Sequence, residues 1–188
     1  MAEVFQNQVV RAVGVVTSYS GSTVAAASTA ITVTALTGIG VSFLVDNPNF
    51  IAGTKVVSTS PVSGGVGTVF TDKNSTNTSS ASSQVVRFLG PTTAFTSPSA
   101  TKSIIIGGTF ANNTNNSVNL SVEMYDTSVG VTSTGSVAIA SKIPVPSGSS
   151  FVISDTGKTL LESGDELKVY CDTTDAIDVS LSILTGVN

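Results

Sequence analysis

The chain has 188 residues, of which 40% are hydrophobic and only 11% charged, with a net charge of −4. So few charges leave Ser, Thr and Asn to form the solvent face, which favours strands and turns and predicts an all-β fold. Single, scattered Lys and Arg residues argue against nucleic-acid binding. The absence of histidine excludes a Ser-His-Asp or Cys-His catalytic arrangement.

Residues 4–16 predict the first strand, with apolar side chains on both faces of the alternation. This pattern is typical of a strand covered on two sides, either central in a sheet or inserted between neighbours. Left exposed, such a strand would be an aggregation hazard. We therefore expect residues 2–10 to pack against another protein chain. The candidate subunit-contact residues are Val4, Phe5, Val9 and Val10.

Residues 21–90 predict a separate inserted module. Short strands alternate there with turn signals about every ten residues, which indicates a small β-barrel or sandwich. One turn is Asp46-Asn47-Pro48-Asn49, where proline fixes φ and the Asp and Asn side chains bond the local backbone. The glycines of residues 64–67 are expected in a hairpin turn, because a phosphate loop would need a following helix.

Residues 1–20 and 91–188 are predicted to form the main domain. Residues 117–125 alternate strictly, with Val118, Leu120 and Val122 on one side, and residues 176–184 alternate in the same way. Such period-two patterns indicate half-buried strands. The expected fold is an antiparallel β-sandwich, jelly-roll-like, that carries the inserted module.

The sequence offers little chemistry for catalysis. Asp165 and Glu166 are an adjacent carboxylate pair, but they follow Gly164 beside a strand, so a solvated turn is the favoured interpretation. The single cysteine, Cys171, is expected to be a small buried hydrophobe. We predict no catalytic, cofactor-binding or metal-binding residue and no enzymatic activity. No secretion signal or bilayer-length apolar run is found either.

Three stretches of the main domain carry a resemblance: VFQNQVVRAVG, TKSIIIGGTFANNTNNSVNLSVEMYD, and IPVPSGSSFVIS followed by TLLESGDELKV. Together they resemble small β-sandwich virion structural proteins of tailed bacteriophages, especially those that infect cyanobacteria. The stretches TALTGIGVSFLVDNPNFIAGTKVVS and GTVFTDKNSTNTSSASSQVVRF in the insert resemble β modules of phage fibre and tail-associated proteins. The resemblance brings no functional residue with it.

The resemblance implies a structural protein of the virion, made in the host cytoplasm. From the residues themselves we predict no cofactor, and neither nucleic acid nor a membrane as partner. The first hypothesis is a capsid decoration or cement protein, a homo-oligomer with a trimer favoured, bound to the major capsid protein. The second is a neck, collar, fibre or other tail accessory protein. A glycan-binding module that contacts the host is weaker, because the chain has no Trp and only three Tyr. A soluble domain without a role in the virion is the remaining alternative.

Overall fold

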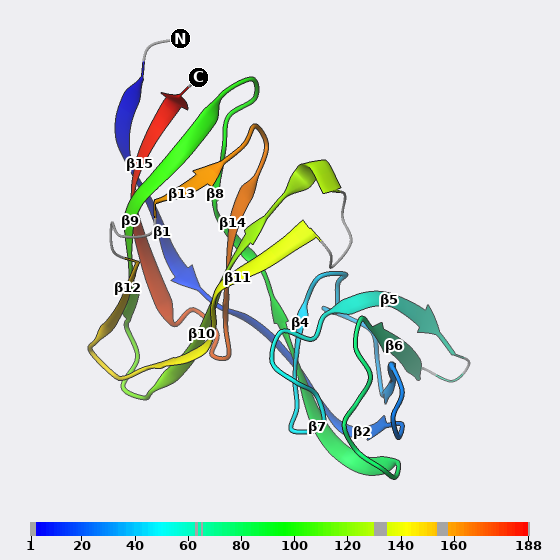
Figure 1. Ribbon diagram of the computed structural model, residues 1–188. Helices are drawn as coiled ribbons and strands as arrows, with labels where there is room; N and C mark the ends of the chain where they lie inside the picture. Colours follow the sequence, from blue (N-terminus) through cyan, green and yellow to red (C-terminus); the bar gives the residue numbers. More distant parts are fainter. Residues whose placement is uncertain (1–2, 63, 65, 130–134, 154–157, 188) are drawn as a thin grey trace. The chain divides into compact units, whose positions relative to one another are not determined.

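The computed structural model describes residues 3–62, 64, 66–129, 135–153 and 158–187. It is all-β, with antiparallel sheets and a short 3₁₀ turn, η1 (Thr127–Val129) (Figure 1). The chain divides into two compact units. Unit 1 is Met1–Gly14 with Thr92–Asn188, and unit 2 is Val15–Pro91.

Unit 1 is a two-sheet sandwich. Among its described residues, one sheet has the order β1-β15-β9-β12, with β13 also pairing with β9, and the other has the order β11-β10-β14-β8. The strands are β1 (Val4–Val13), β8 (Thr92–Thr96), β9 (Lys102–Asn112), β10 (Val118–Tyr125), β11 (Ser136–Val145), β12 (Ser150–Ile153), β13 (Thr159–Leu161), β14 (Glu166–Cys171) and β15 (Ile177–Val187).

The strand order is that of a jelly roll. Because β12 and β13 pair with the same strand, β9, they share one position, the sixth in chain order. The two sheets then have the orders first-eighth-third-sixth and fifth-fourth-seventh-second. This arrangement of two sheets defines the jelly roll. The expected all-β, antiparallel sandwich of jelly-roll type is therefore the observed fold.

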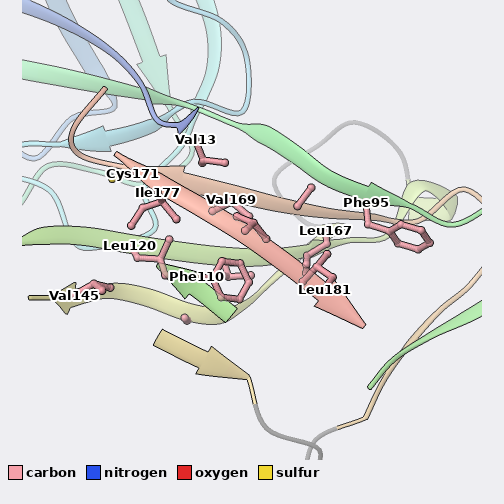
Figure 2. Packing of buried hydrophobic residues seen from close by; sticks show 14 of the residues in the cluster. Val13, Phe95, Phe110, Leu120, Val145, Leu167, Val169, Cys171, Ile177 and Leu181 are labelled. Atoms are coloured by element: carbon pink, nitrogen blue, oxygen red, sulfur yellow. The ribbon is translucent and has the colours of Figure 1, made fainter. Parts of the chain in front are cut away.

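The core of unit 1 lies between the two sheets (Figure 2). Leu120 and Val122 on β10 face it, as the alternation predicts, and so do Ile177 and Leu181 on β15; all four are fully buried. Fully burying each such side chain stabilises the fold by roughly 1.5–3 kcal/mol. Cys171 belongs to the same core, as predicted.

Unit 2 is a small barrel. Its strand order is β4-β7-β2-β3-β6-β5. The strands are β2 (Val15–Val24), β3 (Ala30–Val33), β4 (Leu44–Asp46), β5 (Val56–Pro61), β6 (Gly67–Thr71) and β7 (Ala81–Gly90). The two ends of the sheet meet, because Val45 N–H donates to the Thr54 carbonyl (2.8 Å) and Val56 N–H to that of Phe43 (2.9 Å). Closure removes most of the free edge of the sheet.

The sequence predicted turns in unit 2 at residues 46–49 and at residues 64–67. In the turn at residues 46–49, Asn49 N–H donates to Asn47 Oδ1 at 2.9 Å, which is the expected bond from an Asn side chain to the local backbone. Of the glycine cluster at residues 64–67, residue 65 lies outside the described residues.

The predicted boundary after residue 20 is wrong. Residues from Val15 onward pair with β7 of unit 2, beginning with Val15 opposite Gly90. The chain leaves unit 1 at Gly14, whose φ is +137° and whose added Cβ would meet the Thr173 carbonyl oxygen at 2.1 Å. The apolar alternation continues through Gly14, so the glycine alone marks a bend there, and the sequence does not reveal the change of partner. The second boundary lies after Pro91, one residue beyond the predicted position.

This chain does not itself cover the first strand on two sides, so the expected coverage by another protein chain stays a prediction. The strand ends at Val13, not at residue 16, and β1 is an edge strand that pairs with β15. Val13 is buried and Val10 packs against the core, but much of the remaining strand is exposed. Apolar residues on both faces therefore do not reflect burial within this chain.

Candidate interaction surface

The backbone of β1 has one paired edge and one open edge. Its pairing with β15 runs from Val4 opposite Thr185 to Val10 opposite Val179. A bulge follows, in which Ala12 has a φ of 58° and its N–H donates to Asp178 Oδ1 at 2.9 Å. No strand of the described residues pairs with the other edge of β1. That edge can accept a further strand.

The structure places the four candidate contact residues on different faces of β1. The even-numbered Gln6 and Gln8 lie opposite the buried Ile183 and Leu181, so the even positions face the core. Phe5 and Val9 are odd-numbered and therefore point away from it. Phe5 is 63% exposed and Val9 67%. Val10 lies on the core side and is partly buried, while Val4, on that same side, is half exposed.

Phe5 belongs to an apolar row that crosses the outer face of this sheet. Phe5 is opposite Leu184, Leu184 is opposite Ile104, and Ile104 is opposite Leu160, so that β1, β15, β9 and β13 each contribute one residue. Leu184 and Ile104 are half-buried, and Leu160 is 46% exposed. We call these four residues the apolar row. Sequence reasoning found only Phe5, because the register between distant strands creates the row.

A second row crosses the same face between the exposed residues Val9 and Val152. Between them lie Ser180 on β15 and Thr109 on β9, both exposed and small. Exposed apolar side chains gathered on one sheet face, rather than scattered, indicate a contact surface.

The outer face of the other sheet holds a buried polar cluster. Glu123 on β10 accepts hydrogen bonds from the Ser136 hydroxyl (2.6 Å) and from the hydroxyl of Tyr170 on β14. Nearby, the Lys168 ammonium lies 3.9 Å from the centre of the Tyr125 ring. Burial, and then the negative charge of Glu123, raise the pKa of Tyr170 far above its usual value of 10. Tyr170 therefore stays protonated and structural.

The predicted solvated turn at Asp165 and Glu166 is wrong. Asp165 is buried, and its carboxylate accepts hydrogen bonds from the backbone N–H groups of Glu162 (2.9 Å) and Thr127 (3.2 Å). It thus ties two loops together. Glu166 is half-buried and forms an ion pair with Lys168 at 3.0 Å. The two carboxylates have separate structural partners, and nothing in this arrangement presents them jointly to a substrate.

The remaining features offer little for catalysis or metal binding. Among the described residues, no group of three or more His, Cys, Asp or Glu side chains could hold a metal ion. A small pocket beside β9 is crossed by the ion pair of Lys102 and Glu162, at 2.8 Å. Burial raises the pKa of the Cys171 thiol, which disfavours the reactive thiolate. None of the helical segments in the described ranges has the length and hydropathy to cross a membrane.

Comparison of the chain with protein families, with curated proteins and with solved structures finds no match. The surface must therefore be interpreted from its own chemistry. Its most distinctive part is the open edge of β1 beside the apolar row.

Proposed function

We propose that this protein is a non-enzymatic structural component of a tailed-phage virion, most plainly a decoration or cement protein bound to the head shell. The observation that carries the proposal is the outer face of the β1–β15 sheet, where exposed Phe5 and Val9 adjoin an open strand edge. A strand edge and an apolar face are the features through which sheets add neighbouring chains. The sequence resemblance supplies the virion context.

The jelly roll supports this proposal by analogy, because the fold is used in viral capsid domains. It is also used in lectins, so the fold alone does not decide the function. Sugar sites commonly use exposed Trp or Tyr rings, and this chain has no Trp. Here Tyr125 and Tyr170 are buried, and the hydroxyl of the half-buried Tyr19 donates to the Thr37 carbonyl. A glycan-binding role is therefore the weaker candidate.

The second candidate is a neck, collar or tail accessory protein. What favours it is unit 2, a compact barrel inserted between β1 and β8 of the jelly roll. The insert resembles fibre and tail modules in its sequence. Copy number separates the two candidates: a decoration protein occurs in hundreds of copies per particle, and a neck or tail protein in far fewer.

The test is incorporation into particles. Full-length protein and the variant Val9→Ser are supplied during phage assembly, and their copies per purified particle are counted by quantitative mass spectrometry. We expect Val9→Ser to reduce incorporation severalfold, because it removes apolar contact area without touching the core. The matched control is Val85→Ser, another exposed valine on a strand, in unit 2.

Equal incorporation of both variants would remove the support that the β1 surface gives to this proposal. Absence of the wild-type protein from the particles would overturn the proposal itself. A density map of the particle then separates the head from the neck and tail.

A further inference from the structure

The sequence of β1 reads nearly the same in both directions in its residue types. Asn7 is the centre of residues 3–11, EVFQNQVVR. Positions at equal distance from Asn7 hold two amides, two apolar pairs and one pair of opposite charges: Gln6 and Gln8, Phe5 and Val9, Val4 and Val10, Glu3 and Arg11.

We infer that a second copy of this chain binds the open edge of β1, with the two β1 strands antiparallel and a two-fold axis at Asn7. In such a pair Phe5 lies opposite Val9 of the other copy. Odd positions then meet odd positions, so the outer face of one sheet continues into the outer face of the other. A two-fold axis can pass through any residue of an antiparallel pair, because both its hydrogen-bonded and its non-hydrogen-bonded pairs are symmetric.

Charge complementarity favours a second copy as the occupant. In this register Glu3 lies opposite Arg11 of the other copy, and the two-fold axis repeats the pair. Glu3 is exposed, and the Arg11 side chain is 87% exposed, with Asp178 3.8 Å away. Glu3 directly precedes β1, and Arg11 directly follows Val10, where the register with β15 shifts, so the two charges lie at the two ends of the regularly paired segment. Opposite charges directly across a strand pair stabilise it, whereas like charges destabilise it.

The other strand edges of the described sheets carry devices that discourage pairing. β11 contains Pro144 and has Lys142 at a φ of 51°, β5 ends at Pro61, and β4, β8, β12 and β13 are only three to five residues long. Proline and short length are common protections of an edge. By contrast, β1 has no proline, and its bulge lies after Val10, near the end of the strand. From Val4 to Val10 it pairs regularly with β15, and no strand of the described residues pairs with its other edge.

Apolar contact adds to the backbone bonds. Phe5 and Val9 are each about two-thirds exposed. In the pair, Phe5 of each copy would cover Val9 of the other copy. The apolar row of one copy, which ends at Phe5, would then continue through Val9 of the second copy. One continuous sheet, with its apolar outer face extended across the two-fold axis, would result.

This inference rests on the proposed function only in taking β1 as the contact strand, and it names the partner as a second copy. The pairing is two-fold, so it differs from the trimer expected from the resemblance. Failure of the two ideas is distinguishable, because self-association is measured on the purified protein and the proposed function on particles.

Cysteine cross-linking tests the register. Only the residue on the two-fold axis faces its own copy, so Asn7→Cys should form a covalent dimer under mild oxidation. Phe5→Cys should not, because Phe5 and its copy would lie four positions apart along the strand, roughly 13 Å. The double variant Phe5→Cys/Val9→Cys should cross-link again. The native Cys171 is buried and does not interfere.

A charge reversal gives an independent readout by sedimentation of the full chain. Glu3→Arg places like charges opposite each other at two sites and should raise the dimer dissociation constant by roughly three- to thirtyfold. The exchange Glu3→Arg/Arg11→Glu restores opposite charges and should recover most of the affinity. The melting temperatures of the variants at low concentration control for damage to the fold.

Three results would overturn the inference. One is a wild-type protein that stays monomeric, or sediments as a trimer, while Asn7→Cys forms no covalent dimer. A second is equal cross-linking of Asn7→Cys and Phe5→Cys, which indicates random collision. The third is a charge exchange that fails to recover association although the variant remains folded.

Discussion

The outer faces of the two sheets of the jelly roll reverse the usual relation between polarity and burial. On the β10–β14 face, Glu123 and Tyr170 are almost fully buried, although both are polar. On the β1–β15 face, Phe5, Val152 and Leu160 are about half exposed or more, although all are apolar. The first face has its hydrogen bonds within the unit, whereas the second has apolar area that only another molecule can cover.

This difference shows which face has its interactions satisfied within the unit and which face has apolar area left for a partner. A buried carboxylate is tolerated because Ser136 and Tyr170 donate hydrogen bonds to it. An exposed Phe or Val contributes little to the isolated fold, and it gains roughly 1.5–3 kcal/mol if a partner covers it fully. The polar face should therefore respond to substitutions by losing stability, and the apolar face by losing association.

The sharpest test compares Leu181→Ala with Phe5→Ala. Leu181 is fully buried in the core, so its truncation should lower the free energy of unfolding by about 2–5 kcal/mol. Phe5→Ala should change that free energy by less than about 0.5 kcal/mol, because the ring is largely exposed. Urea denaturation of dilute protein measures both. A large loss for Phe5→Ala would mean that the β1 face is ordinary core.

The next test removes the central acceptor of the polar face. Glu123→Ala leaves the hydroxyls of Tyr170 and Ser136 without this acceptor, and should lower the free energy of unfolding by about 1–3 kcal/mol. The control is Glu162→Ala, whose carboxylate is mostly exposed and pairs with Lys102. That change should cost less than about 1 kcal/mol. Equal losses in the two variants would contradict the buried role of Glu123.

The pH dependence of stability probes the same face. The folded pKa of Tyr170 is raised, first by burial, so the folded state keeps this proton at a pH where the unfolded state releases it. Its contribution is therefore complete below pH 10 and decreases above it, by up to about 1.4 kcal/mol per pH unit. Tyr170→Phe should flatten this alkaline decrease. Denaturation curves measured at several alkaline pH values give the slopes.

The smallest expected effect lies beside the bulge of β1. The Ala12 N–H that donates to Asp178, with the Arg11 charge as a lesser cause, lowers the pKa of that carboxyl. A lowered folded pKa stabilises the protein above the usual Asp range, and the contribution is lost as the pH falls through the folded pKa. Asp178→Asn should cost less than about 1 kcal/mol at neutral pH, because the carboxylate is partly exposed to solvent. The melting temperatures of wild type and variant should differ at neutral pH and become equal as the pH falls into the acidic range.

The sequence predicted the elements whose signal is local. The alternation on β10 identified Leu120 and Val122 as core residues, and composition indicated the all-β class. Burial that depends on residues distant in the sequence could not be predicted. Asp165 looked exposed beside a glycine turn, but its carboxylate binds the Thr127 N–H from another loop.

The candidate surface was predicted in part. Phe5 and Val9 stood out because apolar residues dominate both faces of the first strand, but that pattern is the same for a central strand and for an edge that lacks its neighbour. Leu184, Ile104 and Leu160 could not be assigned to the same surface, because only the register between β15, β9 and β13 aligns them. At Gly14 the glycine indicates a bend or a close backbone approach, but it does not show that the chain changes units there.

The pairing of β1 with β15 has a consequence for how the protein folds. Val4 lies opposite Thr185, so β1 has to wait for the last strand of the jelly roll to be synthesised before the two can pair. Contacts so distant in sequence slow folding, because the loop between them must close first. Unit 2 is continuous in the chain and can complete its barrel during this interval. Throughout synthesis the apolar β1 is therefore unpaired, and this is the period when chaperones would have most to gain from binding it.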